Sequence, residues 1–63
     1  MKIIELVGDR VVVVLNNGIR LEGTIKAVDE GGIGFETSIK SSYIPFSDIK
    51  QIKTIPMLDE VEF

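Results

Sequence analysis

The sequence predicts an all-β fold: a small, strongly bent antiparallel barrel of five strands, with at most one short helical turn at its N-terminus. Short apolar runs rich in β-branched residues alternate with Gly, Asn, Asp and Ser, which is typical of strands separated by tight turns. Asn17-Gly18 lies between two such runs and is typical of a hairpin, because both residues tolerate the positive φ angles of a type I′ turn. Gly23 falls inside the next strand, where the missing side chain permits a sharp bend or the close approach of another backbone.

The first two apolar segments carry different signals. Residues 1–6 are compatible with an edge strand or with a single helical turn, which Gly8-Asp9 ends. Residues 10–15 contain four successive valines, and a continuous β-branched run is typical of a strand covered on both faces. We expect one face to line the barrel interior and the other to be covered by a different segment, such as the N-terminal one.

Alternation of apolar and polar residues predicts the second and third strands. The apolar face of the second strand is predicted to consist of Ile19, Leu21, Ile25 and Ala27. Residues 29–32, Asp-Glu-Gly-Gly, predict the next turn. The third strand follows over residues 33–40, and its predicted apolar face consists of Ile33, Phe35, Thr37 and Ile39.

Two further strands complete the predicted barrel. Residues 43–46 predict a short fourth strand, in which Pro45 lacks an N–H group and belongs at an edge or a strand end. Ser47-Asp48 either caps a short helix, in which Ile recurs every third residue over 49–55, or makes a tight turn before a fifth strand. The abundance of Ile and Thr favours the strand.

Length and composition indicate one domain. The 63 residues divide into a barrel domain at 1–56 and an acidic, apolar tail at 57–63, which is expected to be loose or to pack on a neighbouring molecule. So short a domain buries only about 60% of its unfolded surface and usually needs a disulfide, a metal or self-association. The sequence contains no Cys, which excludes disulfides and favours self-association.

The residue types argue against an enzyme. His and Cys are both absent, so the commonest general base and metal ligand is missing, and we expect no catalytic residue, metal or cofactor. The longest apolar run, 11–15, is far shorter than the roughly 20 residues that cross a bilayer, and no secretion signal is visible. We accordingly expect a soluble, cytoplasmic protein without a membrane partner.

The excess of acidic residues lies in the tail. The formal net charge is −3, and Asp59, Glu60 and Glu62 account for it, so residues 1–56 are neutral. This balance differs from the strongly basic character of most nucleic-acid-binding domains. The tail is interpreted as a plain disordered end, as a segment that repels nucleic acid, or as a segment that covers a basic face of its own chain.

Residues 17–23, Asn-Gly-Ile-Arg-Leu-Glu-Gly, resemble a pattern of the bacterial Hfq-type branch of the Sm-like family, Asn-Gly-Ile-(Lys/Arg)-Leu-Gln-Gly. Residues 25–29, Ile-Lys-Ala-Val-Asp, are similar to the family's Ile-x-x-(Phe/Tyr)-Asp. Residues 43–49 look like its second signature, a short strand, a turn and an Ile that opens the fifth strand. The resemblance spans roughly residues 11–55, and the chain looks like a divergent member, of the kind that phages also encode.

This resemblance implies an Sm-type barrel in a homo-oligomeric ring of roughly five to seven subunits, in which the fourth strand of one subunit pairs with the fifth strand of the next. Such a ring would also hide edge strands that otherwise promote aggregation. The implied function is binding of single-stranded RNA, often rich in uridine or adenine, as an RNA chaperone does. The RNA-binding candidates are Gly18, Ile19, Arg20, Asp29, Gly31, Tyr43 and Phe46.

Several candidates also have a structural interpretation. Arg20 is expected to contact phosphate, to be a solvated strand residue, or to pair with a glutamate such as Glu22 or Glu36. Asp29 is expected to order its loop through backbone amides. Tyr43 and Phe46 are candidates for stacking on bases, with Phe46 alternatively packing in the core or at a subunit interface.

The chain also departs from the family pattern. The Lys-His pair that grips uridine in Hfq-type proteins corresponds to Pro45 and Phe46, the loop aromatic to Gly31, and the aromatic of the distal face to Val14. A second hypothesis is therefore a scaffold or protein-interaction ring that has lost RNA binding. Three lysines are interpreted as a basic rim of the ring or as ordinary solubilising side chains: Lys40, Lys50 and Lys53.

Overall fold

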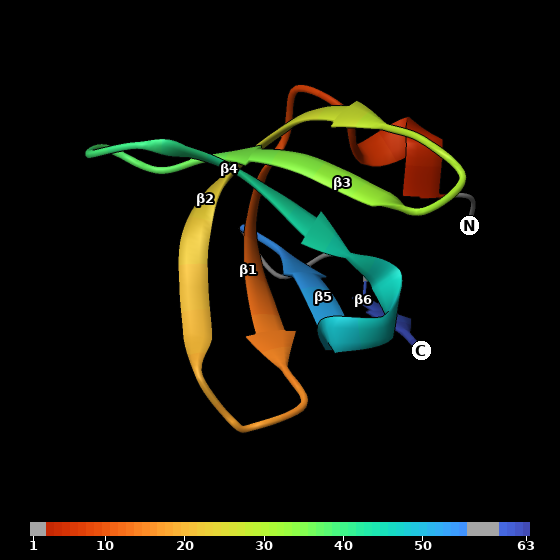
Figure 1. Cartoon of the computed structure of the whole chain (residues 1–63). Helices are drawn as coiled ribbons and strands as arrows, with labels where there is room; N and C mark the ends of the chain where they lie inside the picture. Colours follow the sequence, from red (N-terminus) through yellow and green to blue (C-terminus); the bar gives the residue numbers. More distant parts are fainter. Residues whose placement is uncertain (1–2, 56–59) are drawn as a thin grey trace.

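The chain folds into one antiparallel sheet, as seen in a computed structural model that describes residues 3–55 and 60–63 (Figure 1). The strands in this part are β1 (Arg10–Leu15), β2 (Arg20–Val28), β3 (Gly32–Glu36), β4 (Ser41–Pro45), β5 (Ile49–Thr54) and β6 (Glu60–Glu62). Two short 3-10 helices accompany them, η1 (Ile3–Leu6) and η2 (Phe46–Asp48). The all-β prediction and the helical turn near the N-terminus are confirmed, but the described residues form six strands and two short helical turns rather than the predicted five strands and one turn. The predictions for residues 1–2 and 56–59 lie outside the described residues.

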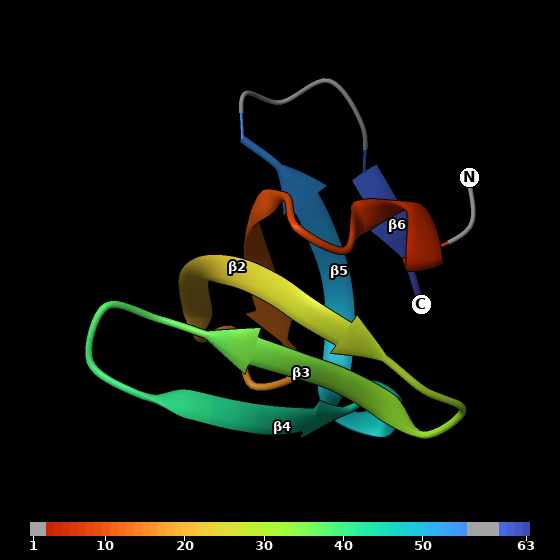
Figure 2. The ribbon, with the colours of Figure 1, turned by 90° about the horizontal axis from the view of Figure 1, so that it is seen from above.

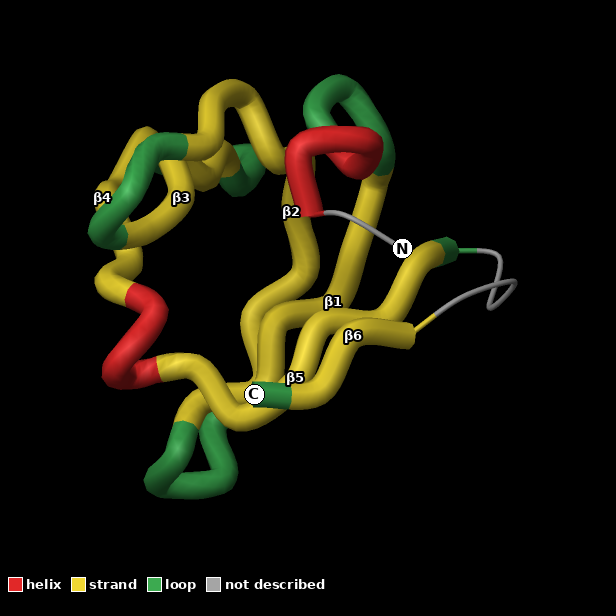
Figure 3. Tube along the Cα trace, turned by 90° about the vertical axis from the view of Figure 1, so that its right-hand side faces the viewer, coloured by secondary structure: helices red, strands yellow, loops and turns green. Residues whose placement is uncertain are grey.

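The strands follow the order β4-β3-β2-β1-β5-β6, so β4 and β6 are the two edges of the described sheet. Seen from above, β3 and β4 run across the direction of β5 (Figure 2). The sheet therefore curls, and β3 and β4 face β1 and β5 across the core (Figure 3). In residues 3–55 and 60–63 no helix has the length and apolar character needed to cross a bilayer.

The β1–β2 hairpin turn contains three residues rather than two. Leu15 N donates to Ile19 O at 2.8 Å, and Gly18 N donates to Leu15 O at 2.9 Å. Gly18 has a φ of 90°, whereas none of the described non-glycine residues has a positive φ. The hairpin prediction is confirmed, but its type I′ geometry is wrong, because that geometry needs two positive φ angles and this turn uses one.

β2 bends along its length (Figure 1), and the backbone of β3 lies close to it at Gly23. A Cβ atom built on Gly23 would lie 2.3 Å from the carbonyl oxygen of Glu36, a distance that no side chain tolerates. The pairing register between β2 and β3 then shifts between Ile25 and Ala27. This bulge reverses the alternation, so that Ala27 is exposed and Val28 packs against the core. The prediction that Ala27 faces inward is wrong for this reason.

The core is formed by inward-facing residues of β1 to β5 together with one residue of η1. Its buried members are Leu6, Val11, Val13, Ile25, Ile33, Phe35, Ile44, Ile49 and Ile52. Besides Ala27, two more predicted inward residues are exposed: Ile19, in the hairpin turn, is 53% exposed, and Ile39 is 87% exposed. β3 ends at Glu36, earlier than predicted, because Thr37 N donates to Lys40 O at 2.8 Å and closes a turn.

The fourth strand begins earlier than predicted and ends at Pro45, because Phe46 already belongs to η2. Hydrogen bonds from Thr37 N to Lys40 O and from Phe46 N to Gly31 O fix its register against β3. Alternation along an antiparallel ladder then directs the backbone groups of odd-numbered β4 residues to the open edge. Pro45 therefore lies on an edge, as predicted, where its missing N–H group breaks no pairing with β3.

The segment after η2 is the predicted fifth strand and not a helix, and it pairs with β1. The expectation of a loose tail is wrong for residues 60–62, which form β6 against β5. Val61 lies opposite the buried Ile52 and packs against the core. Phe63 N donates to Lys50 O at 3.0 Å, which extends the ladder by one residue.

Candidate nucleic-acid interface

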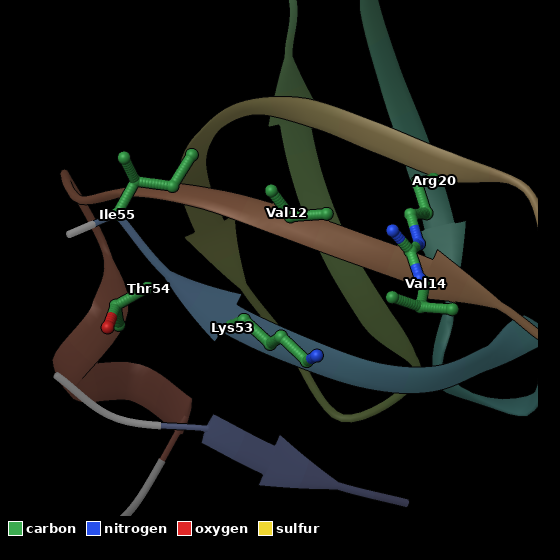
Figure 4. Close-up of a pocket in the computed structure, with 6 residues that line it drawn as sticks. All are labelled: Val12, Val14, Arg20, Lys53, Thr54 and Ile55. Carbon is green, nitrogen blue, oxygen red and sulfur yellow. The ribbon is translucent and has the colours of Figure 1, made fainter. Parts of the chain in front are cut away.

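An apolar groove of about 260 Å³ lies on the outer face of the sheet, where β1 is flanked by β2 and β5 (Figure 4). Its lining residues are Val12, Val14, Arg20, Lys53, Thr54 and Ile55. Three of them are aliphatic and form the floor, and two are cationic. The groove therefore combines a surface for an apolar group with positive charge at the same place.

Strand pairing explains why these side chains meet. Val11 and Val13 are fully buried in the core, so alternation along β1 directs Val12 and Val14 to the opposite face. Val14 pairs with Arg20 on β2, and Val12 pairs with Lys53 on β5. Directly opposite residues of an antiparallel pair share a face, which places both cations beside the valines.

The sequence-based expectation that both faces of residues 10–15 are covered is wrong for the outer face. η1 does not cover Val12 and Val14; instead, its Leu6 enters the core. The two valines are half-buried and line the open groove. The alternation of residues along each strand was visible in the sequence. The register that places Lys53 beside Val12 could be recognised only from the pairing of β1 with β5.

Arg20 and Lys53 approach the same end of the groove from neighbouring strands. In Figure 4 the guanidinium of Arg20 comes down beside Val14, and the side chain of Lys53 extends along β5 toward that end. Glu22, the expected partner of Arg20, pairs with Arg10 instead. Within residues 3–55 and 60–63 neither groove cation forms an ion pair. Both are positioned to meet an anionic group above the valine floor.

β6 places two carboxylates on this same outer face. Glu60 lies opposite Lys53, and Glu62 lies opposite Gln51, in the register of the β5–β6 pair. The acidic end of the chain thus reaches the groove side of the sheet and lowers its positive potential. Residues 60–62 therefore lie beside the basic groove, without an ion pair to Lys53 in the described part of the chain.

A second group of candidate residues surrounds the β2–β3 loop. Asp29 Oδ1 accepts hydrogen bonds from Gly31 N at 2.8 Å, Gly32 N at 2.9 Å and Tyr43 Oη at 2.8 Å. The bond from Tyr43 and then the two amides lower the pKa of Asp29, and the same Asp29 bond raises the pKa of Tyr43. The expectation that Asp29 orders its loop is confirmed.

The two aromatic candidates differ in what they can offer. The side chain of Tyr43 is 53% exposed, although Asp29 holds its hydroxyl group. Phe46 packs against the core and stacks on Phe63, with ring centroids 5.4 Å apart and planes at 21°. The structure favours the packing interpretation of Phe46, because Phe63 occupies a position that a base would need.

The predicted candidates therefore form two separate groups. Gly18, Ile19 and Arg20 lie at the hairpin end of β2, whereas Asp29, Gly31 and Tyr43 lie beyond its other end. Phe46 joins the second group through a 2.9 Å hydrogen bond from its N–H to Gly31 O. Sequence reasoning missed three groove residues, Val12, Thr54 and Ile55. Only Lys53 of the three predicted rim lysines lines the groove.

In the part of the chain that the structure describes, no group of three or more acidic side chains is arranged to hold a metal ion. Comparison with known protein families finds no family model that matches the chain. Comparison with curated proteins finds none that is significantly similar.

Proposed function

We propose that this chain binds single-stranded RNA and assembles with copies of itself into a ring of roughly five to seven subunits. The observation that carries the RNA-binding proposal is the approach of Arg20 and Lys53 to one end of an apolar groove. The exposed backbone edge of β4 supports self-association, because open edges favour pairing with another strand.

In this proposal Arg20 and Lys53 contact a phosphate, and a nucleoside lies against Val12, Val14 and Ile55. Aliphatic side chains offer contact area without aromatic stacking, so one groove provides weak and sequence-tolerant binding. A ring repeats the groove in each subunit, and the repeated sites bind one strand far more tightly than a single site does. Phosphate contacts also make the affinity fall steeply as salt increases.

The test compares two lysines of β5. Lys53→Ala removes a groove cation, whereas Lys50→Ala removes the same charge outside the groove. We expect Lys53→Ala to weaken binding to U-rich and A-rich oligonucleotides by about two- to fivefold, which is about 0.5–1 kcal/mol for an exposed charge contact. It should also lower the slope of log affinity against log salt by about 1 per contacted site. Fluorescence anisotropy across a salt series measures both quantities.

Lys50→Ala should leave the affinity near that of the unmodified chain. Equal losses in the two variants would assign binding to net charge and not to the groove. No binding of either oligonucleotide at about 50 mM salt, where phosphate contacts are strong, would reject the RNA-binding proposal.

A second candidate function is a protein-interaction ring without RNA binding. Glu60 and Glu62 on the groove face favour it, because they offset the charge that an RNA strand would meet. So does the covered position of Phe46. This candidate predicts self-association with no oligonucleotide binding at any salt concentration.

A further inference from the structure

The chain covers one of its own strand edges with a very short strand. β6 contains three residues and pairs with β5, which contains six. The hydrogen bond from Phe63 N to Lys50 O shows that these two residues form a hydrogen-bonded pair of the β5–β6 ladder. Alternation along the ladder makes Ile52 and Val61 the next bonded pair. Without β6, the backbone groups of Lys50 and Ile52 would face solvent.

Few side chains hold β6 in place. Val61 is half-buried against the core, and Phe63 stacks on Phe46 while remaining 52% exposed. Glu60 and Glu62 are both exposed. A strand with little buried apolar surface opens more easily than the strands of the core. β6 is therefore the least firmly held of the described strands.

The opposite edge of the sheet is longer and open. β4 contains five residues, and the backbone groups of Ser41 and Tyr43 point away from β3. Every copy of the chain thus carries one open edge and one edge covered by a short strand. The backbone groups of Ser41 and Tyr43, together with the carbonyl oxygen of Pro45, give this edge at least as many ladder groups as Val61 and Phe63 give β6.

We propose that β6 is a displaceable cap, and that β4 of a second copy of this chain competes with it for the edge of β5. This proposal rests on the self-association proposed above and adds its regulation. Because β6 belongs to the same chain as β5, its effective concentration is on the order of millimolar, and it holds single chains apart when the protein is dilute. Assembly then increases with chain concentration as β4 edges displace the caps.

Because the chain contains no Cys, an engineered disulfide between β5 and β6 can serve as a reversible lock that tests the proposal. Gln51 and Glu62 lie directly opposite each other and form a non-hydrogen-bonded pair of the ladder. The Cα atoms of such a pair lie about 4.5 Å apart, which is within the range that a disulfide spans. We expect the Gln51→Cys, Glu62→Cys double variant to assemble when reduced and to stay monomeric when oxidised. Light scattering and native mass spectrometry from micromolar to millimolar concentration measure the oligomer, and circular dichroism checks that both forms are folded.

Three results would overturn the proposal. The first is the same oligomer in the oxidised and reduced forms, which would show that assembly does not need the β5 edge. The second is a monomer in both forms at every concentration, which would show that nothing competes for that edge. The third is disulfide-linked dimers, which would show that β6 exchanges between chains and is not displaced.

A second variant tests the cap without a disulfide. Val61→Ser removes the main apolar contact of β6 and should lower the concentration at which half of the chains assemble by about tenfold. Val28→Ser is the matched control, because Val28 is also half-buried against the core but lies on β2. An equal shift in both variants would contradict the proposal.

RNA binding is measured on the same samples, which separates the two proposals. Assembly that responds to the lock without any RNA binding rejects only the proposed RNA function. RNA binding with an oligomer that ignores the lock rejects only the cap.

Discussion

A single carboxylate oxygen of Asp29 organises the β2–β3 loop. Its hydrogen bonds make the stability of the fold depend on pH at both low and high pH. The folded chain lowers the pKa of Asp29, so its stabilising contribution is present above 3.8 and is lost as the pH falls through the lowered value. The folded chain raises the pKa of Tyr43. Its contribution is therefore complete below 10.0 and is lost as the pH rises through the raised value.

The ionisation of Tyr43 can be observed directly, because it is the only tyrosine in the sequence. We expect its absorbance titration to give a pKa above 10.0, and Asp29→Asn to return this pKa toward 10.0, because the charged acceptor is replaced by a neutral one. Glu30→Gln is the control, since it removes a neighbouring exposed charge that makes no bond to Tyr43. A titration of the unmodified chain at or below 10.0 would contradict the Asp29–Tyr43 contact.

At the scale of elements, β2 connects the two halves of the barrel, with a close approach to β3 at Gly23 and a shift of register after Ile25. At Gly23 the backbone contact with β3 leaves no room for a Cβ atom. The shift depends on a bulge that the apolar pattern of the sequence does not reveal. β2 therefore determines how β3 and β4 face β1 and β5.

We expect Gly23→Ala to destabilise the fold by about 1–3 kcal/mol, because its Cβ atom would overlap the Glu36 carbonyl oxygen. Gly34→Ala is the control in β3, where the nearest atom to a new Cβ atom is 3.5 Å away. The control should be close to neutral or slightly stabilising. Urea unfolding followed by circular dichroism measures both free energies of unfolding, and equal values would argue against close packing at Gly23.

At the scale of the whole molecule, the outer face carries positive charge at the groove and negative charge on the neighbouring strand β6. The face carries Arg20 and Lys53 at the groove and Glu60 and Glu62 on β6. The neutral balance of residues 1–56 therefore conceals a local separation of charge. RNA binding at the groove of a chain whose β6 is still paired with β5 would take place against the field of its own C-terminal strand.

Glu60→Gln combined with Glu62→Gln should accordingly tighten oligonucleotide binding by about two- to fivefold at low salt, and the gain should disappear at high salt. Glu5→Gln combined with Glu30→Gln removes the same charge from exposed positions on η1 and the β2–β3 loop. Anisotropy titrations compare the two pairs. If both pairs of substitutions tighten binding equally, the effect arises from net charge and not from the position of Glu60 and Glu62 on β6.

The sequence alone was sufficient for the fold class, the hairpin at Gly18, the close backbone approach at Gly23 and the fifth strand. These features depend on local backbone preferences and on alternation within one strand. Both are determined by residues that are neighbours in the sequence. The same local chemistry allowed the loop-ordering role of Asp29 to be predicted.

The tertiary structure decided the groove and β6, because both depend on pairing between strands that are distant in the chain. Val12 lies beside Lys53 only because β1 pairs with β5, and Val61 reaches the core only because β6 adds to β5. The bulge that exposes Ala27 likewise arises from the fit of β2 against β3. Register between distant strands is set by the packing of the whole core, and a local pattern does not specify it.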